Sequence, residues 1–154
     1  MKLTWFGGTA LRVYAGGQIV VVDPDATMEI NAQLDRGSSI GVFNGGTLIV
    51  DQLRFIQPVD FINMSGDFGL SGVLEIAHLA KLANVLLSSD LLSGDFALTF
   101  DFQDGTSTLL HNIQTINPAT FHAAQEQNGT FVLAQNLPTL PSGSQLIPVI
   151  ATSI

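Results

Sequence analysis

The sequence predicts a single α+β or α/β domain in which β-rich mixed sheets carry one or two helices. Short β-rich segments occupy much of the chain and are closed by Gly-Gly, Asn-Gly, Asp-Gly or Asp-Pro turns. One apolar run near the middle has the composition of a buried helix. The length of 154 residues is that of one domain with its own core.

The first half of the chain predicts strands. KLTWFGG, ALRVYAGG and QIVVVDPD are three strand-like segments, which indicate a meander over the first 25 residues. The third segment is continuously apolar, so we expect a strand covered on both faces with Asp23 at its end. A hairpin is predicted over residues 40–56, with Asn44-Gly45-Gly46 as its turn. We interpret the likeness of FGGTALRV and FNGGTLIV as two similar turns rather than a duplication.

A mostly buried helix is predicted from Ser71 to Asn84, with Ser71 as its N-cap. Its expected solvent edge is a polar stripe with a three-residue spacing, formed by Glu75, His78 and Lys81. The following NVLLSS predicts a strand. A helix between two strands joins them in parallel, so we expect a local parallel pair across the unit from Val59 to Ser89.

Two further elements and a tail complete the predicted order. Residues 95–113 alternate apolar and polar side chains about Asp104-Gly105, which predicts a hairpin. A short helix is expected from Asn117, with Pro118 at its first position, to the Asn128-Gly129 turn. Residues 131–154 contain three prolines and suit an edge strand or an extended C-terminal arm laid on a partner.

Composition limits the function. The chain has no cysteine, which excludes disulfides and thiolate sites. It has 5 Lys and Arg against 13 Asp and Glu, a formal charge of −8 that disfavours nucleic acid and anionic membranes. Only 12% of the residues are charged, so we expect a homo-oligomer that hides part of its surface.

Compartment is predicted from the same sequence. No apolar stretch approaches the ~20 residues that a membrane-spanning helix needs. The N-terminus runs directly into strand-like sequence without the basic, apolar and small-residue regions of a signal peptide. We therefore expect a cytoplasmic protein with no membrane partner.

The opening MKLTWFGGTALRVYAGGQIVVVDPD resembles the start of the metallo-β-lactamase superfamily, in the branch that includes L-ascorbate-6-phosphate lactonase-like proteins. Gly16-Gly17 and Asp23-Pro24 match that branch, whereas Gly8 stands where it has His. The resemblance covers residues 1–25 well and 59–113 less well. It implies a shortened αββα-type sandwich, since the whole family fold has two similar halves and generally well over 200 residues. A single half would leave a sheet face for a second subunit to cover.

The family's metal loop, Thr-His-x-His-x-Asp-His, falls on a segment of this chain that lacks the ligands. Met64 takes the place of Thr, Ile113 takes the place of a later Asp, and the ligand positions carry Ser65, Asp67, Gly69 and Leu70. The resemblance therefore implies that the metal site is lost. The titratable residues that could form a residual acid/base site are Asp23, Asp67 and His111.

Three function classes follow. The favoured one is a non-catalytic binding or structural module that forms oligomers, without metal or cofactor and with an unknown small-molecule ligand. The alternative is a hydrolase of the same superfamily, either with a displaced site that holds zinc or another divalent metal elsewhere or with a metal-free site. The third is a β-rich assembly protein with an accidental N-terminal likeness, which the absence of a parallel strand pair around the helix 71–84 would indicate.

Overall fold

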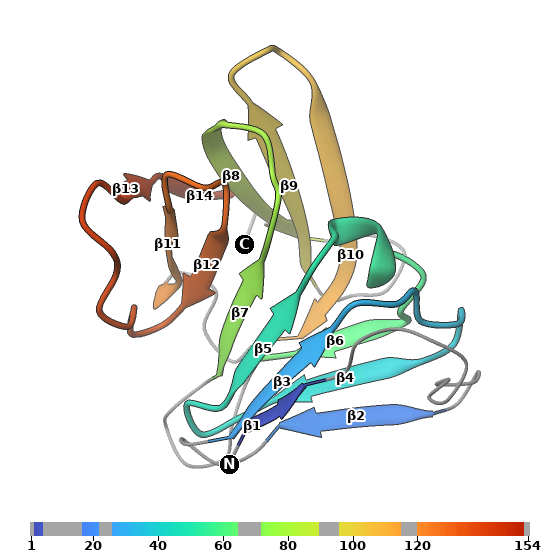
Figure 1. Cartoon of the computed structure of the whole chain (residues 1–154). Coiled ribbons are helices and arrows are strands. Elements are labelled where there is room, and N and C mark those ends of the chain that lie inside the picture. Colours follow the sequence, from blue (N-terminus) through green and yellow to red (C-terminus); the bar gives the residue numbers. More distant parts are fainter. Residues whose placement is uncertain are drawn as a thin grey trace.

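A computed structural model describes residues 2–4, 17–21, 26–64, 72–89, 96–114 and 120–152. These residues form fourteen β-strands and the 3-10 helix η1 (Leu53–Phe55), and they contain no α-helix (Figure 1). The predicted α+β or α/β sandwich with one or two helices is therefore wrong. The described chain is almost entirely β because its apolar segments pair in sheets instead of coiling into helices.

The strands make two sheets of seven. Sheet A contains, in spatial order, β1 (Lys2–Thr4), β3 (Thr27–Ile30), β5 (Thr47–Val50), β7 (Val73–Ile76), β12 (Phe131–Ala134), β11 (His122–Gln125) and β13 (Gln145–Ile147). Sheet B contains β14 (Val149–Thr152), β8 (Leu82–Ser89), β9 (Phe96–Phe102), β10 (Ser107–Gln114), β6 (Phe61–Asn63), β4 (Ser39–Val42) and β2 (Gln18–Val21).

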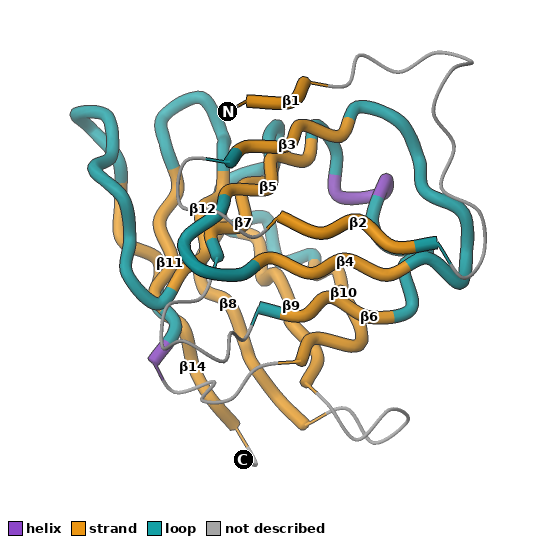
Figure 2. The backbone as a smooth tube through the Cα atoms, turned by 90° about the horizontal axis from the view of Figure 1, so that it is seen from below, coloured by secondary structure: helices purple, strands orange, loops and turns teal. Residues whose placement is uncertain are grey.

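In the N-terminal half the chain winds like a solenoid, because successive strands belong alternately to the two sheets. This winding part is the parallel coil of the fold. Strands of successive turns lie side by side and parallel: β5 lies between β3 and β7 in sheet A, and β4 lies between β2 and β6 in sheet B (Figure 2). One turn takes about 20 to 26 residues, the spacing from Thr27 to its partner Thr47 and from Thr47 to its partner Val73. Such stacking lets each turn bury the apolar face of its neighbour.

The hairpin predicted over residues 40–56 is wrong, because β4 and β5 belong to different sheets. Asn44 and Gly45, with φ of 52° and 79°, turn the chain from sheet B into sheet A. The Asn-Gly-Gly signal correctly marks a tight turn with positive φ. It does not specify whether the strands that flank the turn pair with each other.

The helix predicted from Ser71 to Asn84 is also wrong, since its described residues form β7, a connection and the start of β8. β7 pairs with β5 on one side and β12 on the other. Its side chains are buried on both faces: Leu74 and Ile76 join the main core, and Val73 joins a second cluster. An apolar pattern on all sides fits a doubly covered strand as well as a buried helix.

The strands on either side of that segment do not form the expected parallel pair. β6 pairs with β4 and β10, whereas β8 pairs with β9 and β14. The second predicted helix is wrong where it is described, because residues 122–125 form β11 between β12 and β13. Residues 117–119 of that prediction lie outside the described part.

The hairpin predicted over residues 95–113 is confirmed. β9 and β10 are antiparallel, with Ser107 opposite Asp101, and Gly105 in the turn has a φ of 89°. The hairpin lies between β8 and β6 in sheet B, where β10 runs parallel to β6. It therefore links the coil to the C-terminal strands.

The segment expected to be a C-terminal arm is partly built into the sheets. β12 is an inner strand of sheet A. Leu137 and Leu140 then pack against a small cluster formed by Val73, Val132 and Ala134. This part of the tail therefore covers a sheet of its own chain. The chain then continues into β13 and β14, each at the end of a sheet.

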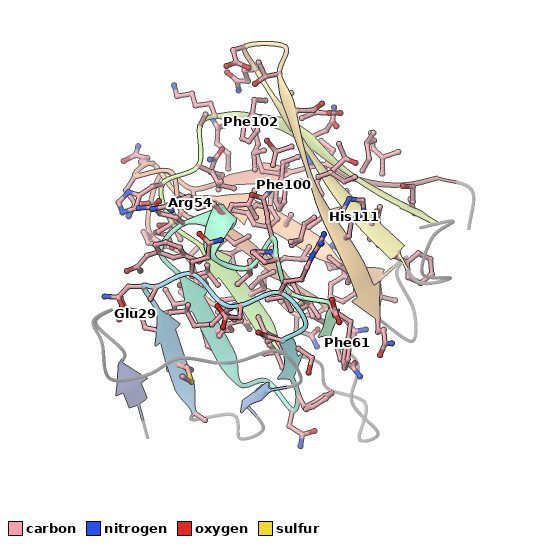
Figure 3. The ribbon with its side chains drawn as sticks, turned by 90° about the vertical axis from the view of Figure 1, so that its right-hand side faces the viewer. Glu29, Arg54, Phe61, Phe100, Phe102 and His111 are labelled. Carbon is pink, nitrogen blue, oxygen red and sulfur yellow. The ribbon has the colours of Figure 1, made fainter. Side chains whose placement is uncertain are left out.

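One large hydrophobic core lies between the sheets. Phe100 of β9 and Phe131 of β12, both fully buried, meet edge to face with ring centroids 5.1 Å apart and an interplanar angle of 84°. Figure 3 shows Phe100 inside the molecule. This aromatic pair connects sheet B to sheet A near the centre of the fold.

Candidate functional site

Most of the site residues predicted from the sequence lie outside the described part of the chain. These are Asp23, Ser65, Asp67, Gly69 and Leu70. His111 is described and is exposed on β10 (Figure 3). The residual site of Asp23, Asp67 and His111 therefore stays a prediction.

Two positions beside the predicted metal loop belong to the hydrophobic core. Met64 is fully buried, and its N–H donates to the carbonyl of Gln114 at 2.9 Å. Ile113 is 1% exposed and pairs with Ile62 of β6. Both side chains contribute to packing between the sheets. Within the described ranges, no group of three or more His, Asp or Glu side chains is placed to hold a metal ion.

None of the helices described is long and apolar enough to span a bilayer.

The best organised polar side chain is that of Gln125, which is 7% exposed at the end of β11. Its Oε1 accepts a hydrogen bond from the N–H of Leu82 at 2.9 Å. Its Nε2 donates to the carbonyl of Ala80 at 2.9 Å and lies 3.3 Å from that of Gly129 and 3.4 Å from that of Leu79. The carboxamide thus supplies the backbone of the irregular connection between β7 and β8 with hydrogen bonds that a neighbouring strand would otherwise provide.

That connection needs an external partner because it is not regular structure. His78 has a φ of 61°, a left-handed conformation that is uncommon for a residue other than glycine. The Leu79 N–H donates to the carbonyl of Gly129 at 3.2 Å. Residues 78–82 are therefore held in place by hydrogen bonds to Gln125 and to Gly129 in the β11–β12 turn.

Beside Gln125 is a cleft with a volume of about 370 Å³. The residues that line it are Lys81, Gln125, Glu126, Gln127, Gly129, Gly143 and Gln145. They come from three segments: the connection before β8, the end of β11 with its turn into β12, and the start of β13 with the turn that precedes it. This volume lies within the ~300–1,000 Å³ of small-molecule sites.

Two glycines with positive φ shape the walls of this cleft. Gly129 has a φ of 93°, and a Cβ there would lie 2.7 Å from the Leu79 carbonyl oxygen. Gly143 has a φ of 86°, and a Cβ there would collide with the carboxamide of Gln127. Both turns therefore allow a close backbone approach that a larger residue would prevent.

Four polar side chains surround the cleft, those of Lys81, Glu126, Gln127 and Gln145. In the part of the chain that the structure describes, no hydrogen bond or ion pair engages the polar ends of these side chains. The set presents an ammonium donor, a carboxylate acceptor and two carboxamides that can both donate and accept. Its chemistry suits recognition of a polar ligand.

A second, more open groove of about 430 Å³ lies between η1, residues 77–80 and the β9–β10 hairpin. Arg54 is fixed at its edge: its Nε donates to Gln52 Oε1 at 2.6 Å, and its guanidinium carbon lies 4.8 Å from the ring centroid of Phe55. Figure 3 labels Arg54 and Phe102, which both contribute to this groove. The contacts with Gln52 and Phe55 hold the guanidinium of Arg54 at this edge.

Sequence reasoning missed Gln125 because it placed the residue in a short helix, where a glutamine would face solvent. One available signal was its position in FHAAQEQNG, directly after two alanines and before an Asn-Gly turn. Lys81 was assigned to a helical stripe and not to a cleft. Only the pairing of β11 with β12 and β13 brings these residues together.

Fold and cleft together define an all-β protein with two mixed sheets, a parallel coil in its N-terminal half and a polar cleft among its C-terminal strands. No known family model matches the sequence, and no curated protein is significantly similar to it.

Proposed function

We propose that the protein is a non-catalytic structural module that assembles with further copies of itself through the edge formed by β13 and β14. The observation that carries the proposal is the apolar and uncharged character of this edge. Residues 127–154 contain no Asp, Glu, Lys or Arg, although the whole chain has a formal charge of −8. Two copies can therefore approach along this surface with little electrostatic repulsion.

The strand order supports a free edge. Among the described strands, β14 is at the end of sheet B with β8 as its partner, and β13 is at the end of sheet A with β11 as its partner. The outer side of an end strand presents N–H and C=O groups that can pair with another chain. Natural proteins commonly guard such strands with charged side chains, and this edge has none.

Apolar side chains on the same edge add a driving force. Leu146 of β13 is 77% exposed and Ile150 of β14 is 43% exposed. Leu146 borders a groove of about 420 Å³ lined largely by apolar residues, including Phe121, Leu137 and Val149. We infer a two-fold pairing in which β14 of each copy lies antiparallel to the other, because a two-fold axis makes one patch its own partner.

Three function classes were considered from the sequence. Of these, a β-rich assembly protein agrees best with the structure, because the described residues of the predicted helix 71–84 form strands of the two sheets and the connection between them. If the N-terminal likeness to the metallo-β-lactamase superfamily reflects descent, the family loop supports the non-catalytic part of the proposal as well. Its ligand positions carry Ser65, Asp67, Gly69 and Leu70, which offer one carboxylate and no imidazole. A cytoplasmic location stays a prediction, which fractionation of cells expressing the protein would test.

Sedimentation velocity at micromolar concentration tests the assembly. The wild type is expected to sediment as two or more chains of 16.3 kDa. Ile150→Lys and Leu146→Lys should each shift it toward the monomer, because a charge on both sides of a two-fold interface repels itself. The matched control is Leu109→Lys, which changes a leucine that is 39% exposed on β10, away from this edge. A monomeric wild type, or oligomers unaffected by both edge variants, would overturn the proposal.

A further inference from the structure

We propose that the cleft beside Gln125 binds a neutral saccharide of one or two sugar units. The inference is independent of the proposed self-association, because it rests on different side chains. Gln145 lines the cleft, whereas its neighbour Leu146 borders the apolar groove. Successive residues of a strand face opposite sides, so β13 can contribute to both surfaces at once.

The cleft is preorganised. One lining residue is Gln125, whose carboxamide donor and acceptor are satisfied by the backbone of Ala80 and Leu82 at 2.9 Å. Gln125 is therefore not free to bind a ligand, but it fixes the connection that carries Lys81. The β11–β12 turn is held by a Glu126 N–H bond to the Thr130 carbonyl at 2.8 Å and by a Gly129 N–H bond to the Glu126 carbonyl at 3.0 Å. The backbone frame of the site therefore needs little ordering when a ligand binds, and the entropy cost falls on the four side chains that contact the ligand.

The polar groups match hydroxyl groups better than ions. A sugar hydroxyl donates one hydrogen bond and accepts others, and neighbouring hydroxyls repeat that pattern. Gln127 and Gln145 each offer a donor and an acceptor, Lys81 adds a donor and Glu126 adds an acceptor. Each of these four groups can therefore form a hydrogen bond with a sugar hydroxyl. A neutral sugar has no charged group of its own that would need an ionic partner.

The same set disfavours anions and metal ions. A phosphate or carboxylate ligand would meet Glu126 as well as Lys81 among the lining residues, so the cleft supplies no net positive charge, and the whole chain has a formal charge of −8. A divalent metal needs several oxygen or nitrogen ligands, and Glu126 is the one carboxylate among the lining residues. A zwitterion such as a dipeptide is the competing chemistry, because Lys81 and Glu126 could bind its two charges.

The experiment titrates the ¹⁵N-labelled 154-residue chain with maltose, cellobiose, lactose and N,N′-diacetylchitobiose, and in parallel with glycylglycine, while recording backbone and side-chain amide resonances. At least one disaccharide is expected to bind with a Kd at or below the order of 1 mM. Binding should change the chemical shifts of the side-chain amides of Gln127 and Gln145. The side-chain amide signals of Gln125 should stay at their original positions, because this carboxamide is already hydrogen-bonded to the backbone. Hydroxyl recognition by carboxamides predicts this pattern.

Variants locate the site. Gln127→Ala and Gln145→Ala should each weaken the binding about five- to tenfold, since each removes a donor and an acceptor from an exposed position whose loss the fold tolerates. Gln57→Ala is the matched control, because Gln57 is exposed and lies outside the cleft. Binding of glycylglycine alone would overturn the saccharide assignment in favour of a zwitterion site. No shift with any of the four disaccharides, or sugar binding that both glutamine variants leave unchanged, would also overturn it.

Discussion

The carboxamide of Gln125 and the backbone N–H of Leu82 are joined by a buried hydrogen bond of 2.9 Å between residues 43 positions apart. The bond ties β11 of sheet A to the first residue of β8 in sheet B. One side chain thus fixes the place where the chain leaves one sheet for the other. The same side chain belongs to a residue that lines the polar cleft.

Gln125→Ala is expected to lower the free energy of unfolding by about 2 to 4 kcal/mol, because it leaves the Leu82 N–H and the Ala80 carbonyl without partners in a buried place. Urea unfolding followed by circular dichroism measures the loss. Gln127→Ala, two residues along and exposed, should change the stability by no more than about 0.5 kcal/mol. Equal stability of the two variants would show that the Gln125 contacts contribute little.

Two turn glycines with similar φ should respond differently to alanine. Gly105 has a φ of 89° with no atom within 4 Å of an added Cβ, so Gly105→Ala should cost only the left-handed strain, about 1 to 2 kcal/mol. Gly129 has a φ of 93° and would place its Cβ 2.7 Å from the Leu79 carbonyl oxygen. Gly129→Ala should therefore cost at least about 3 kcal/mol. Thermal unfolding compares the two, and an equal loss would contradict the predicted clash.

The contact between Phe100 and Phe131 is expected to couple the two sheets energetically. Phe100→Leu and Phe131→Leu each keep an apolar side chain and should each destabilise the protein by about 1.5 kcal/mol. The double variant should lose less than the sum by about 0.5 to 1.5 kcal/mol, because the edge-to-face contact is absent in either single variant. Additive losses in a denaturant double-mutant cycle would argue that the rings contribute only by their buried area.

Acid stability should depend in part on Asp104. The Thr106 hydroxyl, which donates to Asp104 Oδ1 at 2.6 Å, and the Thr106 N–H, at 2.8 Å, lower the pKa of this carboxyl below its ordinary value of 3.8. Because the folded-state pKa is the lower one, the stabilising contribution is complete above the unfolded-state value. It is lost as the pH falls through the folded-state value.

Removing the hydroxyl tests this cause. Thr106→Val should raise the pKa of Asp104 toward 3.8, as measured by a carbon-detected NMR titration of its carboxyl. Thr108→Val is the control, since Thr108 lies beyond the turn on β10 and does not bond Asp104. An unchanged titration in Thr106→Val would mean that the backbone N–H alone holds the carboxylate.

Local signals predicted some elements correctly. The alternation of residues 96–102 and the Asp104-Gly105 turn specify a hairpin whose strands are neighbours in sequence, so short-range chemistry is sufficient. NVLLSS was likewise predicted as a strand and forms the second part of β8. The turn at Asn44 and Gly45 was found from its residues, although its role as a corner between sheets was not.

The errors occurred where the partner of a segment lies far along the chain. SGVLEIAHLAKLAN has good helix formers, yet Val73 to Ile76 pair with β5 and with β12, some 55 residues later. Two strand partners and two covered faces offset a modest helix propensity. The cleft was missed for the same reason, since Lys81, Glu126 and Gln145 come from three distant segments.

The sequence alone determined that this chain is rich in β-structure, acidic, free of cysteine and poor in charge, and it located the hairpin and several tight turns. Only the tertiary structure decided that the segment at 73–89 forms strands of two different sheets and that Gln125 is a buried structural side chain. The physical reason is range: turn and alternation signals act within a few residues, whereas the choice between helix and strand depends on which distant backbone is available for pairing.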